Sequence, residues 1–296
     1  MKQNHGYCYR LQLDDKAAGQ TLLGFLSKRF PHSTTIEWLS RIRDNQIALN
    51  GSIASESQLL AAGMVMVWNR PGWAEEATPQ SYRIVFEDEH LLAVDKPSGL
   101  PTLPGAGFYL NTLLSFVRTD HPTARPLHRL GRGTSGLVLF ALSREAARVL
   151  TCQWPQIEKQ YQALGSYAAH QQEYDIRAPI GLIEHPRLGK VHAAEALGKP
   201  ARSVARPLLR REESTVFEVD LHTGRPHQIR IHLACIGHPL VGDPLYDVDG
   251  RLKESPGLPG ELGYHLHAKR LRFEHPLTKR PLEVASPLPE LLRVEP

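Results

Sequence analysis

The stretch TGRPHQIRIHLACIGHPLVGDPLY, residues 223–246, predicts a short helix with a defined beginning and end. Pro226 stands where a helix begins and Gly237 where one stops, which is the usual asymmetry of helix termini. Immediately before it, residues 214–221 (STVFEVDL) alternate apolar and acidic side chains, as a strand with one buried face does. The stretch therefore indicates a strand followed by a helix, with Arg and His near the junction.

Upstream, the chain from residue 84 is typical of many short strands. Residues 84–101 (IVFEDEHLLAVDKPSGLP) predict two strands separated by an acidic turn. Residues 135–143 (SGLVLFALS) predict an apolar strand, and residues 144–154 (REAARVLTCQW) a helix. The alternation is too irregular for a doubly wound sheet. Residues 84–296 are therefore expected to form an α+β domain on a mixed, largely antiparallel sheet.

The N-terminal part predicts two helices, over residues 16–30 and residues 34–46. Thr21 stands near the start of the first, and Thr34 or Thr35 is the expected N-cap of the second. The apolar positions of the second helix are expected on its buried side: Ile36, Leu39 and Ile42. Its basic positions are expected to face water: Arg41 and Arg43.

The segment after these helices predicts a hairpin. An Asn50-Gly51 turn follows a short apolar run, and residues 61–71 (AAGMVMVWNRP) read as the returning strand. Together the elements predict a small helix-helix-hairpin module over residues 10–70. Residues 71–83 combine Pro, Gly and Glu without periodicity, and we expect them to be a linker.

The composition is that of a globular protein with a weakly basic balance. The 296 residues are 41% hydrophobic, and 35 Lys and Arg against 31 Asp and Glu give a net charge of +4, which suits a polyanionic partner. Cys8, Cys152 and Cys235 lie far apart, so neither a disulfide framework nor a zinc knuckle is indicated. The sequence has no recognisable signal peptide or membrane span. We expect a cytoplasmic monomer without membrane contact.

The motifs that hold metals and nucleotides are missing from the sequence. His227 and His232 are five positions apart, and His265 and His267 two, whereas zinc proteases use a pair four apart with an intervening Glu. No phosphate-binding loop, Rossmann fingerprint or nucleophile elbow occurs. Neither a metal nor a nucleotide cofactor is expected.

Several segments combine Arg, His, Tyr or Gly with the end of a strand or helix. They are LLAVDKPSGLPTLPG (91–105), HRLGRGTSG (128–136), EKQYQALG (158–165), the opening stretch, and LHAKRLRFEHPLTKRPLEVASPLP (266–289). In this order they resemble the RluA family of RNA pseudouridine synthases, from about residue 86 to the C-terminus. The module at 10–70 is similar to the small RNA-binding domain, first known from ribosomal proteins, that many members carry. The resemblance implies isomerisation of a flipped uridine in structured ribosomal or transfer RNA, without a cofactor.

The resemblance also implies roles for individual residues. Arg129 is expected to help fill the gap left by the flipped base, Tyr161 to stack on that base, and Arg230 to pair with the catalytic Asp of the family. RNA contacts are implied at basic positions: Lys28, Arg29, Arg41, Arg43, Arg132, Lys159, Arg225 and His227. Contacts to phosphates position the RNA without reading its sequence.

The central residue departs from the family pattern, because Gly131 stands where the family has its catalytic Asp. Glycine can neither attack the ribose nor remove a proton from it, and losing such a group costs on the order of 10⁴-fold in rate. Three interpretations stay open. A carboxylate from elsewhere enters the site, the chain binds RNA as a non-catalytic folding or assembly factor, or the scaffold carries an unrelated activity. The candidate carboxylates are Asp243, Asp95 and Glu145.

Overall fold

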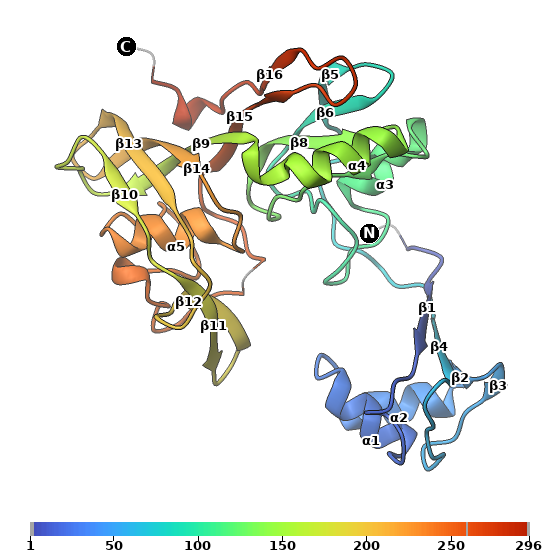
Figure 1. The fold of residues 1–296 in the computed structure, drawn as a ribbon. Coiled ribbons are helices and arrows are strands. Elements are labelled where there is room, and N and C mark those ends of the chain that lie inside the picture. Colours follow the sequence, from blue (N-terminus) through green and yellow to red (C-terminus); the bar gives the residue numbers. More distant parts are fainter. Residues whose placement is uncertain (1–2, 259, 295–296) are drawn as a thin grey trace. The chain divides into compact units, whose positions relative to one another are not determined.

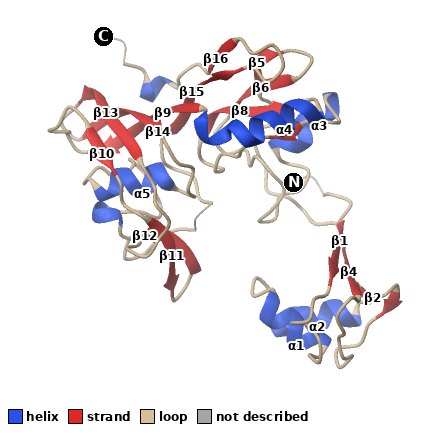
Figure 2. Ribbon diagram, in the orientation of Figure 1, coloured by secondary structure: helices blue, strands red, loops and turns tan. Residues whose placement is uncertain are grey.

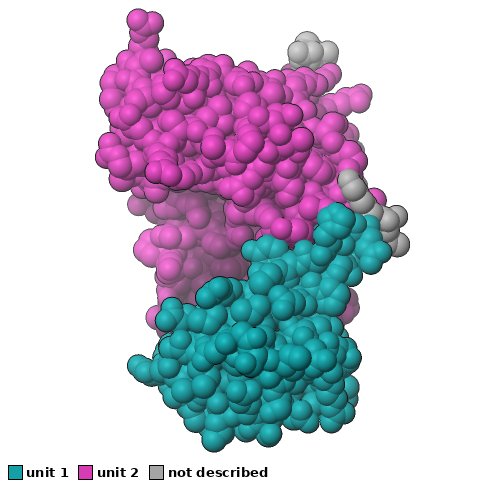
Figure 3. Space-filling view, turned by 90° about the vertical axis from the view of Figure 1, so that its right-hand side faces the viewer, with its two compact units in different colours: residues 1–76 teal, residues 77–296 magenta. Residues whose placement is uncertain are grey.

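The computed structural model describes residues 3–258 and 260–294. The chain divides into two compact units, residues 1–76 and 77–296, coloured teal and magenta in Figure 3. The division falls inside the segment 71–83 that the sequence marks as a linker. Each unit has a hydrophobic core of its own, so each is described by itself.

The first unit is built from two helices and a small sheet (Figure 1). Its elements are β1 (Tyr7–Gln12), α1 (Leu22–Arg29), α2 (Thr35–Arg43), β2 (Ile47–Leu49), β3 (Ser52–Ile53) and β4 (Val65–Arg70). The strands pair antiparallel in the order β1-β4-β2-β3. The structure contains the two helices and the hairpin predicted from the sequence, and β1 is an additional strand.

Side-chain caps start both helices of this unit. Thr21 Oγ1 accepts from the backbone of Gly24, and Thr34 forms a capping box with Glu37. In α2 the buried residues are Trp38 and Ile42, one turn apart. The expectation that Ile36 is buried is wrong: Ile36 is 80% exposed. Residues two positions apart point to opposite sides of a helix, and Trp38 decides which side is buried.

The second unit holds a large sheet, three α-helices and a separate hairpin among its described residues. Its elements are β5 (Arg83–Glu87), β6 (Leu91–Lys96), α3 (Leu113–Asp120), β7 (Arg125–Pro126), β8 (Ser135–Ala141), α4 (Arg144–Gln153), β9 (Glu158–Ser166), β10 (Tyr174–Ile176), β11 (Ile180–His185), β12 (Gly189–Ala194), β13 (Ser203–Arg210), β14 (Ser214–Leu221), α5 (Gln228–Cys235), β15 (Leu266–Glu274) and β16 (Pro281–Ala285). Short 3₁₀ helices are formed by Trp154–Gln156, Val248–Gly250 and Glu290–Leu292. No described helix is long and apolar enough to cross a bilayer.

The large sheet consists of two halves that meet at one short junction. Its order is β10-β13-β14-β9-β15-β8-β6-β5, with β16 beside β15 and β7 beside β8. The ladders between described strands are antiparallel, except that β8 runs parallel to β15. Helices α3 and α4 accompany the β8–β6 half, and α5 accompanies the β13–β14 half (Figures 1 and 2). The expected α+β class with a largely antiparallel sheet is confirmed.

The junction itself is two residue pairs long. Ser135 pairs with His267 and Gly136 with Ala268, and Ser135 Oγ lies 2.9 Å from His267 Nδ1. Gly136 has a φ of +103°, and a Cβ placed there would lie 2.6 Å from the backbone nitrogen of Ala268 and closer still to its carbonyl oxygen. Only glycine fits this position, because it tolerates positive φ and brings no Cβ into the neighbouring strand.

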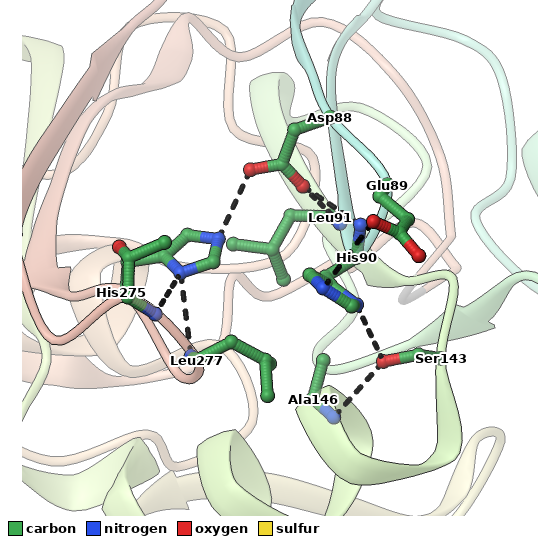
Figure 4. A network of polar contacts seen from close by, with 9 residues as sticks. Asp88, Glu89, His90, Leu91, Ser143, Ala146, His275 and Leu277 are labelled. Carbon is green, nitrogen blue, oxygen red and sulfur yellow. Dashed lines mark hydrogen bonds and ion pairs between the residues drawn. The ribbon is translucent and has the colours of Figure 1, made fainter.

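Near the β5–β6 turn, a polar network connects three segments that are distant in sequence (Figure 4). Asp88 Oδ1 accepts from the backbone of His90 and Leu91, and Asp88 Oδ2 lies 3.0 Å from His275 Nε2 in the turn after β15. His90 Nδ1 lies 3.3 Å from Ser143 Oγ, which caps α4. The β5–β6 turn is thereby tied to the β15–β16 turn and to the start of α4.

Candidate active site

The loop HRLGRGTSG leads into β8 and is held against the loop that follows β6. The buried Lys96 Nζ donates to the carbonyl oxygens of Leu100 at 2.7 Å and Arg132 at 3.3 Å, and Ser98 Oγ donates to Gly133 O at 2.8 Å. Burial lowers the pKa of Lys96 to about 7, and the charge of Asp95 opposes this shift in part. These bonds fix the backbone of the loop on one side of the predicted centre.

Tyr264 fills the space beside Gly131. A Cβ placed on Gly131 would lie 3.2 Å from the Tyr264 hydroxyl oxygen and 3.6 Å from Thr134 Oγ1, and a Cβ on Gly133 would lie 2.9 Å from the tyrosine ring. Thr134 Oγ1 and the Tyr264 hydroxyl are hydrogen-bonded at 3.2 Å. Neither glycine has a positive φ. Space therefore disfavours a side chain at Gly133, whereas a Cβ at Gly131 needs the Tyr264 hydroxyl to move by a few tenths of an ångström.

Arg230 has a carboxylate partner, and that partner is Asp243. Arg230 Nε and Nη2 donate to the two carboxylate oxygens at 2.7 Å each, and the two side chains are 2% and 1% exposed. Burial opposes the charge on Arg230, but the hydrogen bonds from Asp243 outweigh it and raise the pKa of the guanidinium. Asp243 Oδ1 also accepts from the backbone of Leu245 and Tyr246. Both carboxylate oxygens of Asp243 are thus occupied by structural hydrogen bonds.

The candidate carboxylates do not reach the Gly131 position. Among the described residues, no carboxylate atom lies within 4 Å of a Cβ placed on Gly131. Asp95 is half-buried within β6, and Glu145 is exposed in the first turn of α4. The group that stands closest to the missing carboxylate is a phenol, which the sequence did not single out because nothing local to Tyr264 marks it.

Tyr161, Arg129 and His227 surround the same junction. Tyr161 in β9 pairs with Ala268, the residue of β15 that also faces Gly136, and burial raises the pKa of Tyr161 to about 12. Arg129 is exposed. Burial, followed by the charge of Arg230 and a smaller effect of Arg129, lowers the pKa of His227 to about 3. Through Ala268 the structure places Tyr161 across β15 from Gly136, and through Tyr264 it links Arg230 with Gly131.

Three predicted RNA contacts of this unit make internal bonds instead. Lys159 is buried, and its Nζ donates to the carbonyl oxygens of Trp154 and Ile157, so it is not presented to a phosphate. Arg132 Nε donates to Gly99 O at 3.1 Å, and Arg225 Nε donates to a carbonyl oxygen at 3.0 Å. Arg132 and Arg225 are half-buried, so only part of each side chain faces water.

The predicted RNA contacts of the first unit separate into two groups. Lys28, Arg29 and Arg43 are exposed. The expectation that Arg41 faces water is wrong. Its guanidinium lies between the rings of Trp38 and Trp68, 4.5 and 4.9 Å from their centroids, and burial lowers its pKa. Cation–π stacking and a bond to a buried serine keep Arg41 inside the unit.

Comparisons with known proteins identify the family of this chain. Residues 90–235 match the family model described as RNA pseudouridylate synthase. An uncharacterized RNA pseudouridine synthase of Synechocystis sp. is 39% identical, over 93% of this chain and 96% of its own length. The chain belongs to the RNA pseudouridine synthase family. The ribosomal large subunit pseudouridine synthase D of Nitrosomonas europaea is 32% identical, over 95% of this chain and 84% of its own length.

A solved structure supports the same assignment for the pseudouridine synthase fold. Human RNA Pseudouridylate Synthase Domain Containing 1 aligns with a TM-score of 0.59 at 25% identity, over 75% of this chain and 89% of that chain. The family and the fold predicted from the motifs are therefore confirmed.

Two buried histidines of this family member are expected to make it unstable in acid. Burial lowers the pKa of His128 to about 3, and its Nε2 accepts a hydrogen bond from Leu139 N at 3.0 Å, so the ring is neutral. His227 is similar. Between pH 6.5 and 3 the unfolded chain binds protons that the folded chain does not, so stability falls as pH falls. Each histidine is expected to remove about 2 kcal/mol between pH 7 and pH 5.

Urea unfolding at pH 7 and pH 5 measures this loss. His128→Gln is expected to reduce the difference between the two pH values, and the matched control His5→Gln, at an exposed position, to leave it unchanged. Equal pH dependence in the wild-type and His128→Gln proteins would contradict the assignment.

Proposed function

We propose that this chain isomerises uridine to pseudouridine in structured RNA, ribosomal or transfer RNA, after flipping the base out of its stack. The observation that carries the proposal is the β8–β15–β9 junction, where the loop 128–136 leads into β8 and Tyr161 lies in β9, the two strands that flank β15. The name of the Nitrosomonas relative supports ribosomal RNA as the substrate class. The described residues contain no group of three or more His, Cys, Asp or Glu that could hold a metal ion.

A second candidate function rests on Gly131. In it the chain binds the same RNA without catalysis, as a folding or assembly factor, because the family's carboxylate is missing and no other one stands in its place among the described residues. The two candidates share the RNA partner and differ only in whether the uridine is converted. A direct assay of the product separates them.

The experiment uses total RNA from a strain that lacks the gene. The purified protein is incubated with this RNA, and pseudouridine is mapped by a chemical tag specific to that base. We expect at least one uridine to be converted by the wild-type protein and not by Tyr161→Leu, because a flipped base loses its stacking partner in this variant. Binding of the RNA without any conversion by the wild-type protein would favour the second candidate.

RNA affinity is expected to fall steeply with salt, because Lys and Arg displace counterions from the phosphates. Replacing both Lys28 and Arg29 by Gln removes two exposed cations and is expected to reduce the slope of log affinity against log salt by about 1 to 2. Titration of a labelled RNA between about 50 and 200 mM salt measures the slope. The matched control is Arg280→Gln, an exposed cation of the other unit. An unchanged slope in the double variant would remove the first unit from the RNA interface.

A further inference from the structure

The parallel register of β8 and β15 brings the segments before both strands together. In a parallel pair the two strands begin at the same end, and Ser135 faces His267. The residues just before them, the loop 131–134 and Tyr264, are therefore neighbours. The phenol oxygen lies beside the position that a side chain at 131 would occupy.

We propose that Tyr264 is a catalytic residue of this chain, whose hydroxyl takes the place of the missing carboxylate and exchanges a proton with the ribose of the flipped uridine. The inference rests on the proposed function. Its oxygen is the heavy atom nearest to a Cβ placed on Gly131, and Thr134 Oγ1 holds it there at 3.2 Å. Tyr264 and Tyr161 are 5% and 8% exposed, so a nucleotide that contacts them is shielded from water.

A side chain at position 131 or 133 would come close to Tyr264. An aspartate at 131 would bring its side chain close to the phenol, since its Cβ alone would lie 3.2 Å from the hydroxyl. At 133 a Cβ would lie 2.9 Å from two ring carbons, closer than side chains approach one another. The loop thus has room for the tyrosine or for the carboxylate, and this chain has the tyrosine.

Arg230 faces the ring of Tyr264. Arg230 Cζ lies 4.4 Å from the centre of the tyrosine ring and 5.0 Å from that of Tyr246. Both carboxylate oxygens of Asp243 accept hydrogen bonds from the Arg230 guanidinium. From the loop side, Arg132 stacks on Phe108, with its Cζ 4.8 Å from the ring centre. A cation over the face of an aromatic ring attracts that ring, so Arg230 helps to hold Tyr264 in position.

In the proposed reaction, Tyr264 exchanges one proton with the ribose. The Tyr264 hydroxyl gives its proton to water before the nucleotide binds, and its oxygen then takes the proton from ribose C2′. The electrons of that C–H bond form a C1′–C2′ double bond, and the electrons of the C1′–N1 bond leave with the uracil. After the base turns, the phenol returns the proton to C2′ while an electron pair of uracil C5 forms the new bond to C1′. C5 then loses its proton and N1 gains one, so the product is an isomer and the phenolate is regenerated.

The first test is Tyr264→Phe, which keeps the ring and removes only the hydroxyl. We expect the rate of pseudouridine formation to fall by about 10² to 10⁴-fold, as for loss of a general base, with RNA affinity and unfolding midpoint unchanged. The matched control Tyr167→Phe, at an exposed tyrosine, is expected to retain the full rate. Wild-type and Tyr264→Phe proteins of equal rate would overturn the inference and leave the proposed function intact. A wild-type protein that converts no uridine would overturn both.

The second test uses the link between positions 131 and 264. Gly131→Asp alone is expected to be destabilised and no faster than wild type, because the carboxylate and the phenol compete for one space. Gly131→Asp combined with Tyr264→Ala makes room for the carboxylate and is expected to be at least tenfold faster than Tyr264→Ala alone. A fast and stable Gly131→Asp single variant would show that the two side chains do not exclude each other, which overturns the argument from volume.

Discussion

Gly136→Ala is expected to lower the free energy of unfolding by at least about 3 kcal/mol, because it combines a disfavoured φ with a collision between two backbones. The residue has a φ of +103°, and a Cβ there would lie within 2.6 Å of Ala268 N. The collision falls on the two-pair junction that joins the halves of the sheet. Urea unfolding followed by circular dichroism measures the loss.

The control for this substitution is Gly237→Ala. Gly237 also has a positive φ, +82°, but a Cβ there would meet no atom within 4 Å. This variant reports the conformational cost alone, about 1 kcal/mol. Equal losses in the two variants would show that the sheet junction can spread apart at little cost, and that the close approach of β8 to β15 is not what requires glycine.

The second large effect is expected from breaking the buried pair of Arg230 and Asp243. Asp243→Ala leaves a guanidinium that is 2% exposed without its carboxylate, which costs about 3 to 5 kcal/mol. The double variant Arg230→Met with Asp243→Ala removes both charges and is expected to lose less than the sum of the single variants Arg230→Met and Asp243→Ala. Urea unfolding of the four proteins completes the cycle.

An exposed ion pair supplies the comparison. Lys190 and Glu184 lie 3.4 Å apart with side chains 67% and 75% exposed, and Glu184→Gln is expected to cost less than about 1 kcal/mol. A similarly small cost for Asp243→Ala would mean that this carboxylate is not committed to the fold. It would then become available again as a substitute for the missing catalytic Asp.

Local structure followed from local sequence in this chain. The caps at Thr21 and Thr34 bond within one turn, and the Asn50-Gly51 turn has the positive φ values, 49° and 85°, that its residue types favour. In β14, Phe217 and Val219 are buried while Glu218 and Asp220 are half-exposed, as the alternation predicts, but Val216 on the acidic face is buried as well. Each of these features depends on only a few consecutive residues, so the local sequence is enough to predict it.

The expectations that failed concern contacts with distant parts of the chain. Arg41 is held inside by Trp68, a residue of another strand, and Ile36 is exposed because Trp38 occupies the core. Lys159 lies in a strand that the sheet and the preceding turn bury. A basic side chain is expected to be exposed on average, but tertiary packing decides each case.

The sequence by itself determined the family, the order of the motifs and the missing acid at Gly131. The tertiary structure decided what stands in its place. Tyr264 is more than 130 positions from Gly131, and Asp243 meets Arg230 through a turn that no local pattern assigns to it. The parallel register of β8 and β15 places Tyr264 against the loop. A sheet register joins residues without regard to their separation in sequence, so only the folded chain shows that the hydroxyl of Tyr264 lies beside Gly131.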